Sequence, residues 1–361
     1  MCLPKDEGGL GIRRLSHFNT ALMVSHIWKL LSNKDSIWVR WTHSHKLHAR
    51  NFWDVPISGN MSNGWRHMLR LRSTIRDFMW HKIGNGSTVS VWFDKWCEIG
   101  PLSNIISYRD IYRSGLNPQS KVADLIHEGA LVWPTYLSDK YSVLSSCSSS
   151  VNNDQDCLVW RLSDGSLKLF SVCQVWSSIR PRDNKVIWYN MVWFPNNIPR
   201  HAFNLWLIIK RKLKTQDRIC WWDVDSNLGS TCSLCDLIPD THDHLFFDCS
   251  FADSVWSHMK SLAGLANLPH NVYSIVDQLG SSTNQRSTQI VVAKLVLAAS
   301  TYFIWQERNW RLFKKSKRTV NQVIEGIYTT VRLKLLSCCF KRSKEAEGYA
   351  RLWDLPNSVF R

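Results

Sequence analysis

The sequence predicts a mainly helical α+β protein with short β-hairpins, and three patterns favour that fold class. In the last hundred residues, apolar side chains recur with the period of an α-helix. The stripe consists of Val320, Val323, Ile324, Ile327, Val331 and Leu335. Residues 84–87 form a tight-turn signal, and alternating apolar residues from Val89 to Phe93 follow it, which is typical of a hairpin. The opening seventy-odd residues show helical spacing from Phe18 to Leu31.

The chain is long enough for several domains. Its 361 residues exceed the size of a typical domain, roughly 100 to 200 residues. Residues 145–156 are mostly Ser, Asn and Asp with little to bury, so they are predicted to be a linker. We therefore predict a helical segment at 1–75, a hairpin-containing connector at 76–150, a central module at 157–262 and a basic helical C-terminal domain at 263–361.

The net charge, the apolar segments and the cysteine content indicate which partners and which cellular compartment to expect. The net charge of +16 implies attraction to polyanions, and nucleic acid or an acidic membrane surface would both fit. No signal-like apolar segment follows Met1, and the apolar stretch 290–305 is interrupted by Lys294, so a buried helix is expected rather than a membrane span. The eleven cysteines favour a reducing compartment. We expect a nuclear or cytoplasmic protein that is not secreted and has no membrane partner.

Four residues have the spacing of a metal site. Cys232 and Cys235 can reach one ion from a turn, and His244 and Cys249 supply a second pair. Three thiolates and one imidazole favour a closed tetrahedral Zn²⁺ site, which is structural because no position remains for a reactive water. The alternative is a pair of buried thiols beside a surface histidine. Rivals for the ligand positions are His242, Asp236 and Asp248.

A basic segment precedes the cysteines. Its cations are Arg200, Lys210, Arg211, Lys212, Lys214 and Arg218, against a single acid, Asp217. Trp206, Trp221 and Trp222 are interleaved with them. Cations beside aromatic rings suit phosphate neutralisation and base stacking on a single strand. The alternative is a solvated helix face with tryptophans in the core. A second basic stretch, 311–318, is by default interpreted as a charged helix end.

Catalytic patterns are missing from the sequence. Two-metal nucleotidyl transfer commonly uses an adjacent Asp pair, and the chain contains no Asp-Asp. The carboxylates that ribonuclease H chemistry would need are scattered through helical segments after the metal motif. We therefore expect a protein without polymerase, endonuclease or ribonuclease H activity.

Several sequence motifs together resemble a known family. They are Val192-Trp193-Phe194, Ile198 to Phe203, Trp206, Leu213 to Arg218, Cys232-Ser233-Leu234-Cys235, His244 to Cys249 and Trp256. They resemble the zinc-binding domain that follows the polymerase in reverse transcriptases of plant LINE-type (non-LTR) retroelements. Pro4 to Ile12 resembles the segment after the polymerase, so 1–75 would be thumb-like. Gly84 to Leu102 resembles the connector between them.

The resemblance implies a function in nucleic-acid binding. The family's module would help a polymerase hold its RNA template or DNA target, so we expect a non-catalytic, retroelement-derived zinc protein. It would bind RNA or DNA without strong sequence preference, single strands being favoured, and a reverse transcriptase supplied by another chain is a candidate partner. The alternatives are a zinc-stabilised protein-interaction module and a non-functional retroelement fragment. Steep weakening by salt would distinguish phosphate binding from apolar docking.

Overall fold

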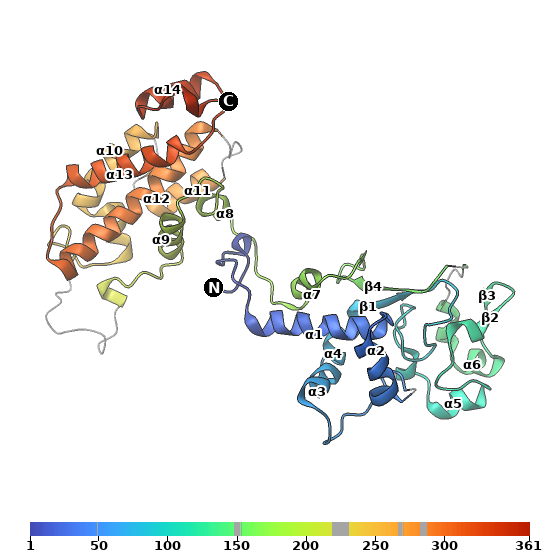
Figure 1. The fold of residues 1–361 in the computed structure, drawn as a ribbon. Coiled ribbons are helices and arrows are strands. Elements are labelled where there is room, and N and C mark those ends of the chain that lie inside the picture. The colour runs from blue at the N-terminus through green and yellow to red at the C-terminus, as the bar shows by residue number, and fades with distance from the viewer. Residues whose placement is uncertain are drawn as a thin grey trace. The chain divides into compact units, whose positions relative to one another are not determined.

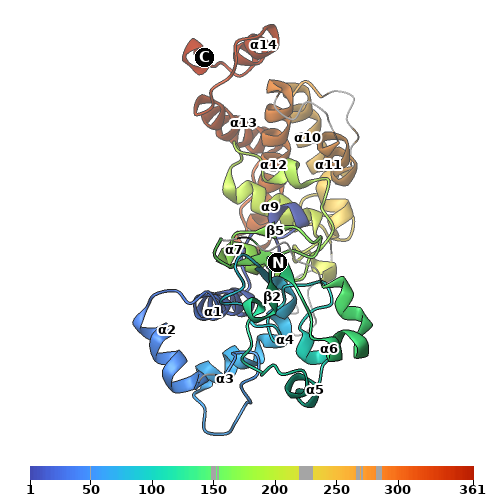
Figure 2. The same ribbon diagram turned by 90° about the vertical axis from the view of Figure 1, so that its right-hand side faces the viewer.

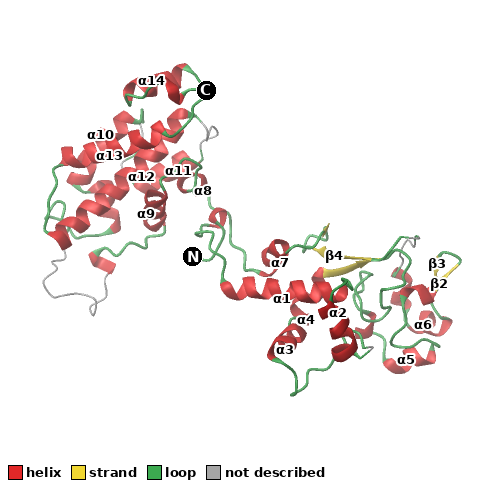
Figure 3. Cartoon of the chain, in the orientation of Figure 1, coloured by secondary structure: helices red, strands yellow, loops and turns green. Residues whose placement is uncertain are grey.

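The chain folds into two compact units. The structure is a computed structural model that describes residues 1–48, 50–147, 152, 154–218, 231–265, 269, 271–281 and 287–361. Unit 1 comprises Met1–Ile12 and Asp183–Arg361, and unit 2 comprises Arg13–Arg182 (Figure 1). Each unit has its own hydrophobic core. Helices predominate and the strands are short and antiparallel, which confirms the predicted fold class (Figure 3).

The two units divide the chain differently from the four predicted segments. The predicted linker, residues 145–156, falls within the bounds of unit 2, because strand β4 (Cys157–Arg161) pairs with β1 (Met79–Lys82). Residues 1–75 and 76–150 contribute to one core in unit 2, apart from Met1–Ile12. In the same way, the predicted C-terminal domain shares the core of unit 1 with the cysteine module. Domain bounds that depend on such long-range packing cannot be predicted from local composition.

Unit 2 combines short helices with a small sheet. The helices are α1 (Leu15–Leu31), α2 (Ile37–Thr42), α3 (Asn63–Arg70), α4 (Arg72–Ile75), α5 (Tyr108–Arg113), α6 (Thr135–Lys140) and α7 (Val172–Ile179). Serines at the N-caps help to define several of them, as where the Ser171 hydroxyl accepts the Gln174 amide at the start of α7. Helix α7 packs against α1, and the Trp28 and Phe170 rings stack beside that contact.

The predicted hairpin after residues 84–87 was wrong. Val89, Val91 and Phe93 lie in turns, because Asp94 accepts the Ser90 amide at 2.7 Å and Trp96 donates to the Val91 carbonyl. Strand β1 instead joins β4 and β5 (Leu167–Lys168) in an antiparallel sheet with the order β1-β4-β5. A second hairpin pairs β2 (Ile126–His127) with β3 (Ala130–Leu131). The turn between β4 and β5 contains Ser163-Asp164-Gly165-Ser166, residue types that favour tight turns.

Asp156 fixes the glycine-rich turn. Its carboxylate accepts the amides of Gly84, Gly86 and Thr88, and also the Thr88 hydroxyl, at 2.8 to 2.9 Å. Gly86 has φ of +72°, and a Cβ on Gly84 would lie 2.3 Å from a backbone oxygen, so both positions require glycine. Partial burial raises the pKa of Asp156, but the backbone hydrogen bonds outweigh it and the net pKa is lowered.

Unit 1 is a helical bundle around one long helix. Its helices are α8 (Tyr189–Val192), α9 (Pro199–Ile209), α10 (Ser250–Leu262), α11 (Val272–Gly280), α12 (Thr288–Asn309), α13 (Val320–Leu336) and α14 (Lys344–Leu352). Helix α12 contacts α8, α9, α10, α13 and α14, and both views show it running through the bundle (Figure 2). On α13, Val323, Ile327, Val331 and Leu335 are fully buried, and Val320 and Ile324 are partly buried.

Helix α12 is the buried helix that the stretch 290–305 predicts, although it is longer. Together with the turn that follows, residues 288–314 are long and apolar enough to cross a membrane by length and composition alone. In unit 1, however, 61% of the most apolar window is buried inside the protein. Lys294 is 1% exposed and its ammonium lies over the Phe194 ring; burial lowers the pKa of Lys294 to about 8.

Replacing Asp156 with Ala should destabilise unit 2. The change leaves three amides without their acceptor, and we expect a loss of about 1 to 3 kcal/mol in unfolding free energy. Because the folded pKa is lowered, the stabilisation exists above the unfolded pKa of about 3.9 and disappears as pH falls through the folded value. Chemical denaturation at pH 7 and pH 3 measures both effects. Asp35→Ala, at an exposed carboxylate of the same unit, is the control and should change little. An equal loss at the two pH values would contradict the role of the carboxylate.

Candidate metal centre

A tight loop presents the first two cysteines. Thr231 and Pro239 bridge across the base of the loop, and the Cys232 amide donates to the Ile238 carbonyl at 2.7 Å. The Asp236 amide donates to the Cys232 carbonyl, and Asp236 has φ of +57°. These bonds turn the chain sharply between Cys232 and Cys235, so that both thiols face the same side.

The second pair comes from the start of α10. His244 begins a turn that spans His244–Asp248, and the Cys249 amide donates to the His244 carbonyl at 2.7 Å. Cys249 is the N-cap residue of α10, where free backbone amides and the helix dipole favour a thiolate. The turn therefore brings the His244 imidazole close to the Cys249 thiol, although the two residues are five positions apart in sequence.

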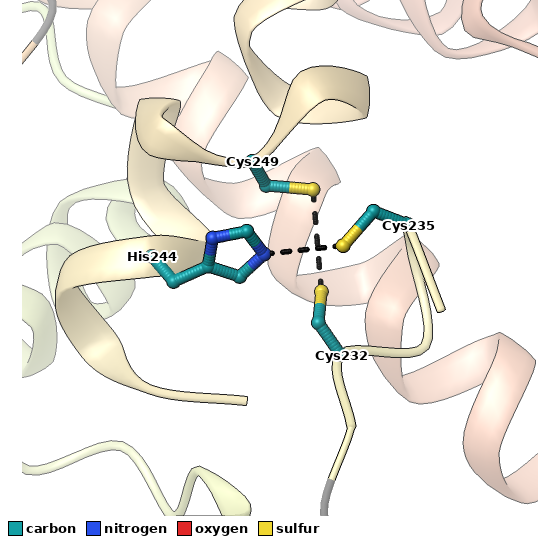
Figure 4. Close-up of side chains that lie close together, drawn as sticks. All are labelled: Cys232, Cys235, His244 and Cys249. Carbon is teal, nitrogen blue, oxygen red and sulfur yellow. Dashed lines mark hydrogen bonds between the residues drawn. The ribbon is translucent and has the colours of Figure 1, made fainter. Parts of the chain in front are cut away.

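All four side chains point toward a common centre (Figure 4). The Cys232 and Cys249 sulfurs are 4.0 Å apart, and the Cys235 sulfur lies 3.2 Å from His244 Nε2. Every pair of the four ligand atoms lies within 4.8 Å. A tetrahedral zinc ion with ordinary bond lengths would separate its sulfurs by about 3.8 Å and sulfur from nitrogen by about 3.5 Å. The cluster therefore has the donor set and nearly the dimensions of a zinc site.

The environment of the thiols suits a cation. The hydrogen bond from Cys232 lowers the pKa of Cys249, as do the amides of Ala252 and Phe251. The same hydrogen bond and burial raise the pKa of Cys232. A bound dication would stabilise the thiolate forms of both cysteines.

The rival ligands lie elsewhere. His242 is buried, and its Nε2 is hydrogen-bonded to the Leu213 carbonyl at 3.1 Å, so it fixes the preceding loop. Burial lowers the pKa of His242 and keeps it neutral there. Asp236 is exposed and lies 3.7 Å from Lys317, and Asp248 is exposed as well. Among the described residues, none of the three belongs to the ligand cluster.

Charged side chains at the end of α12 hold the cysteine loop. Arg311 donates to the carbonyls of Ser233 and Leu234, the two residues between the first cysteines. The Ser233 hydroxyl donates to the Arg308 carbonyl at 3.2 Å. Arg308 forms a fully buried ion pair with Asp240, at the far end of the loop. The loop is therefore attached to the bundle by α12 and by the turn that follows it.

Glu307 orders the basic stretch that follows. Its buried carboxylate pairs with Arg311 and Arg318, each at 2.8 Å. The default interpretation of residues 311–318 as a charged, solvated helix end is therefore wrong at Arg311 and Arg318. The hydrogen bonds to the two arginines outweigh burial and lower the pKa of Glu307. The spacing of Glu307 and Arg311, one helical turn, is the only local signal of this network.

The predicted nucleic-acid-binding cations are all exposed. Helix α9 ends at Ile209 and Arg211 has φ of +50°, so Lys210, Lys212 and Lys214 lie on an irregular segment after the helix, and Arg218 ends a short 3-10 turn. The six exposed cations are Arg200, Lys210, Arg211, Lys212, Lys214 and Arg218. Both terminal nitrogens of Arg211 bond to Asp243, and Arg218 donates to the Arg211 carbonyl.

The prediction that Trp206 stacks on bases was wrong. Trp206 is 1% exposed, and its indole N–H donates to the Gly8 carbonyl at 3.0 Å, so neither face is available to a ligand. Apolar packing of α9 against α12 places this side chain in the core. Trp221 and Trp222 lie outside the described residues. The alternative interpretation, in which the tryptophan is core, therefore holds at Trp206.

Sequence reasoning missed one exposed aromatic residue beside these cations. Phe203 is 44% exposed, and its ring stacks on Trp206 with centroids 5.9 Å apart. The Lys212 ammonium lies 5.6 Å from the other ring of this stack, that of Trp206. Phe203 precedes Lys210 by seven residues, two turns of a helix, which puts both near one face.

Comparison with known proteins agrees with this geometry. Residues 170–256 match the family described as zinc-binding in reverse transcriptase. An Arabidopsis thaliana protein named "Putative ribonuclease H protein" is 24% identical over 273 residues, which cover 71% of this chain and 42% of that protein. An "Uncharacterized mitochondrial protein" of the same plant is 27% identical over 97 residues, which cover 27% of this chain and 63% of that protein. No solved structure matches. The chain thus carries the zinc-binding domain of reverse transcriptases.

Proposed function

We propose that the protein is a non-catalytic, retroelement-derived module in which a structural zinc ion supports a surface that binds single-stranded RNA or DNA. The observation that carries the zinc assignment is the convergence of three thiols and one imidazole on one point. With four protein ligands, the ion would have no open position for a reacting water. The site therefore fits a structural role. We propose that the protein is nuclear or cytoplasmic.

The purified protein should contain one zinc ion per chain. Cys235→Ser should lose the ion and much of the order of the cysteine loop, because a hydroxyl is a poor zinc ligand and ligand binding is coupled to local folding. Elemental analysis of the dialysed protein measures the first outcome, and hydrogen exchange in residues 231–249 measures the second. Acidification should release zinc, since protons compete for the thiolates and the imidazole.

The exposed Cys339 offers a matched control for this variant. It belongs to unit 1 but lies outside the cluster, so Cys339→Ser should keep the full zinc content. Stoichiometric zinc in Cys235→Ser would remove Cys235 from the ligand set. A chain that binds no zinc when folded in its presence would overturn the metal assignment altogether.

The nucleic-acid proposal rests on exposed charge beside an exposed ring. Lys210, Lys212, Lys214 and Arg218 are exposed along the segment after α9, and the exposed Phe203 precedes Lys210 by seven residues. Flexible cations on such a segment can follow a phosphate backbone, and a partly exposed phenyl ring can stack on a base. We leave Arg211 out of the core of this surface because Asp243 neutralises it. A separate reverse transcriptase chain remains the proposed partner.

Changing Lys210, Lys212, Lys214 and Arg218 to Ala should weaken binding of single-stranded RNA. If each cation contacts one phosphate, the slope of log affinity against log salt should fall by up to about 2.8, from roughly 0.7 per contact. Phe203→Ala should weaken binding by about 1 to 3 kcal/mol while leaving the slope unchanged, because stacking releases no counterions. Titration of a labelled oligonucleotide at several salt concentrations measures both quantities.

An equal loss of charge elsewhere provides the comparison. Lys314, Lys341, Lys344 and Arg351 are exposed cations of the same unit, and their combined replacement by Ala keeps the same net charge as the first variant. If both variants lose affinity equally, the attraction is diffuse and the proposed surface is wrong. Unchanged affinity in both, with tight salt-independent binding to a protein partner, would favour the alternative of a protein-interaction module.

A further inference from the structure

Two cysteines outside the metal cluster lie in contact within unit 2. The Sγ atoms of Cys97 and Cys147 are 2.7 Å apart, although 50 residues separate them in sequence. Both side chains are buried, 5% and 3% exposed. Two sulfurs at this distance are closer than ordinary van der Waals contact and lie within about 0.7 Å of a disulfide bond length. We infer that Cys97 and Cys147 are a redox pair that peroxide converts into an intramolecular disulfide.

The surrounding structure holds the two thiols together. Cys97 follows the buried Trp96, whose ring stacks on Trp133 in the core. Cys147 follows a turn, Ser142–Ser146, that packs Leu144 into the same core. Cys97, Cys147 and Leu144 are all members of the hydrophobic core of unit 2. The pair is therefore a feature of the packed unit.

The helix before that turn is anchored independently. The buried Asp110 carboxylate accepts hydrogen bonds from Tyr136, Lys140 and Tyr141 at 2.6 to 2.8 Å. These bonds fix α6 and the start of the turn that carries Cys147. Among the described residues, no third metal-ligating group joins the two thiols. A thiol pair without further ligands is suited to oxidation rather than to metal binding.

The two thiols are not equivalent, and this gives the reaction an order. The hydrogen bond from Cys147 lowers the pKa of Cys97, whereas the same bond and burial raise the pKa of Cys147. The Cys97 thiolate would attack one peroxide oxygen, breaking the O–O bond and leaving Cys97 as a sulfenic acid with release of hydroxide. The Cys147 sulfur then displaces the sulfenic oxygen as water. In sum, two thiols and one hydrogen peroxide give one disulfide and two waters.

Mass spectrometry of the full chain tests the inference. The zinc-loaded, reduced protein is treated with hydrogen peroxide, alkylated and digested with trypsin without reduction. Trypsin places Cys147 and Cys157 in one peptide, residues 141–161, so the experiment uses Cys157→Ser, which removes an exposed thiol. The expected product links residues 96–109 to residues 141–161. The protein should stay monomeric on a non-reducing gel.

Thermal unfolding gives a second measurement. The crosslink closes a long loop, so oxidation should raise the melting temperature of unit 2 by about 5 °C or more, and a reductant should reverse the rise. Cys97→Ala should abolish both the crosslink and the rise, whereas Cys173→Ser, at an exposed thiol of the same unit, should preserve them.

The inference is wrong if peroxide leaves Cys97 and Cys147 separately alkylated or oxidises each to a sulfinic acid without a link. It is equally wrong if either cysteine links mainly to another partner. Because these outcomes are measured on a chain with both cysteines intact, a destabilised Cys97 variant would not obscure them.

Discussion

The buried charges at the end of α12 are the interaction on which the cysteine module depends. Glu307 and Arg308 are both inaccessible to water, and a buried charge is tolerated only when it is paired and hydrogen-bonded. Their partners, Arg311 and Asp240, touch or flank the loop between the first two cysteines. The requirement to pair these charges therefore fixes the loop against the helical bundle before any metal is considered.

Zinc would complete this arrangement rather than create the whole unit. The core of unit 1 extends from α8 to the C-terminus and includes Cys232 and Cys249 as buried members. Two of the ligands are thus held by apolar packing, and Cys249 also by the start of α10. A bound ion would link the cysteine loop to the turn that carries His244 and to Cys249 at the start of α10. Its removal is expected to loosen residues near the cluster more than the distant helices.

The surface proposed for nucleic acid is adjacent in sequence to the metal module but different in kind. Its cations lie on an irregular segment after α9, where side chains can adapt to a flexible strand. The tryptophan that the sequence favoured as a stacking residue instead anchors α9 to the core through Gly8. Trp206 is buried, whereas Phe203 is 44% exposed, and Phe203 is therefore the ring that we propose for base stacking.

Local patterns in the sequence determined the helical stripe of α13, the turn between β4 and β5, and the spacing of Cys232, Cys235, His244 and Cys249. Each depends on residues within about one or two turns of one another, where backbone geometry fixes which side chains can meet. Only the tertiary structure decided that β1 pairs with β4, that Trp206 is core, and that Cys97 meets Cys147. These outcomes depend on which distant surfaces exclude water together, and no local periodicity encodes that choice.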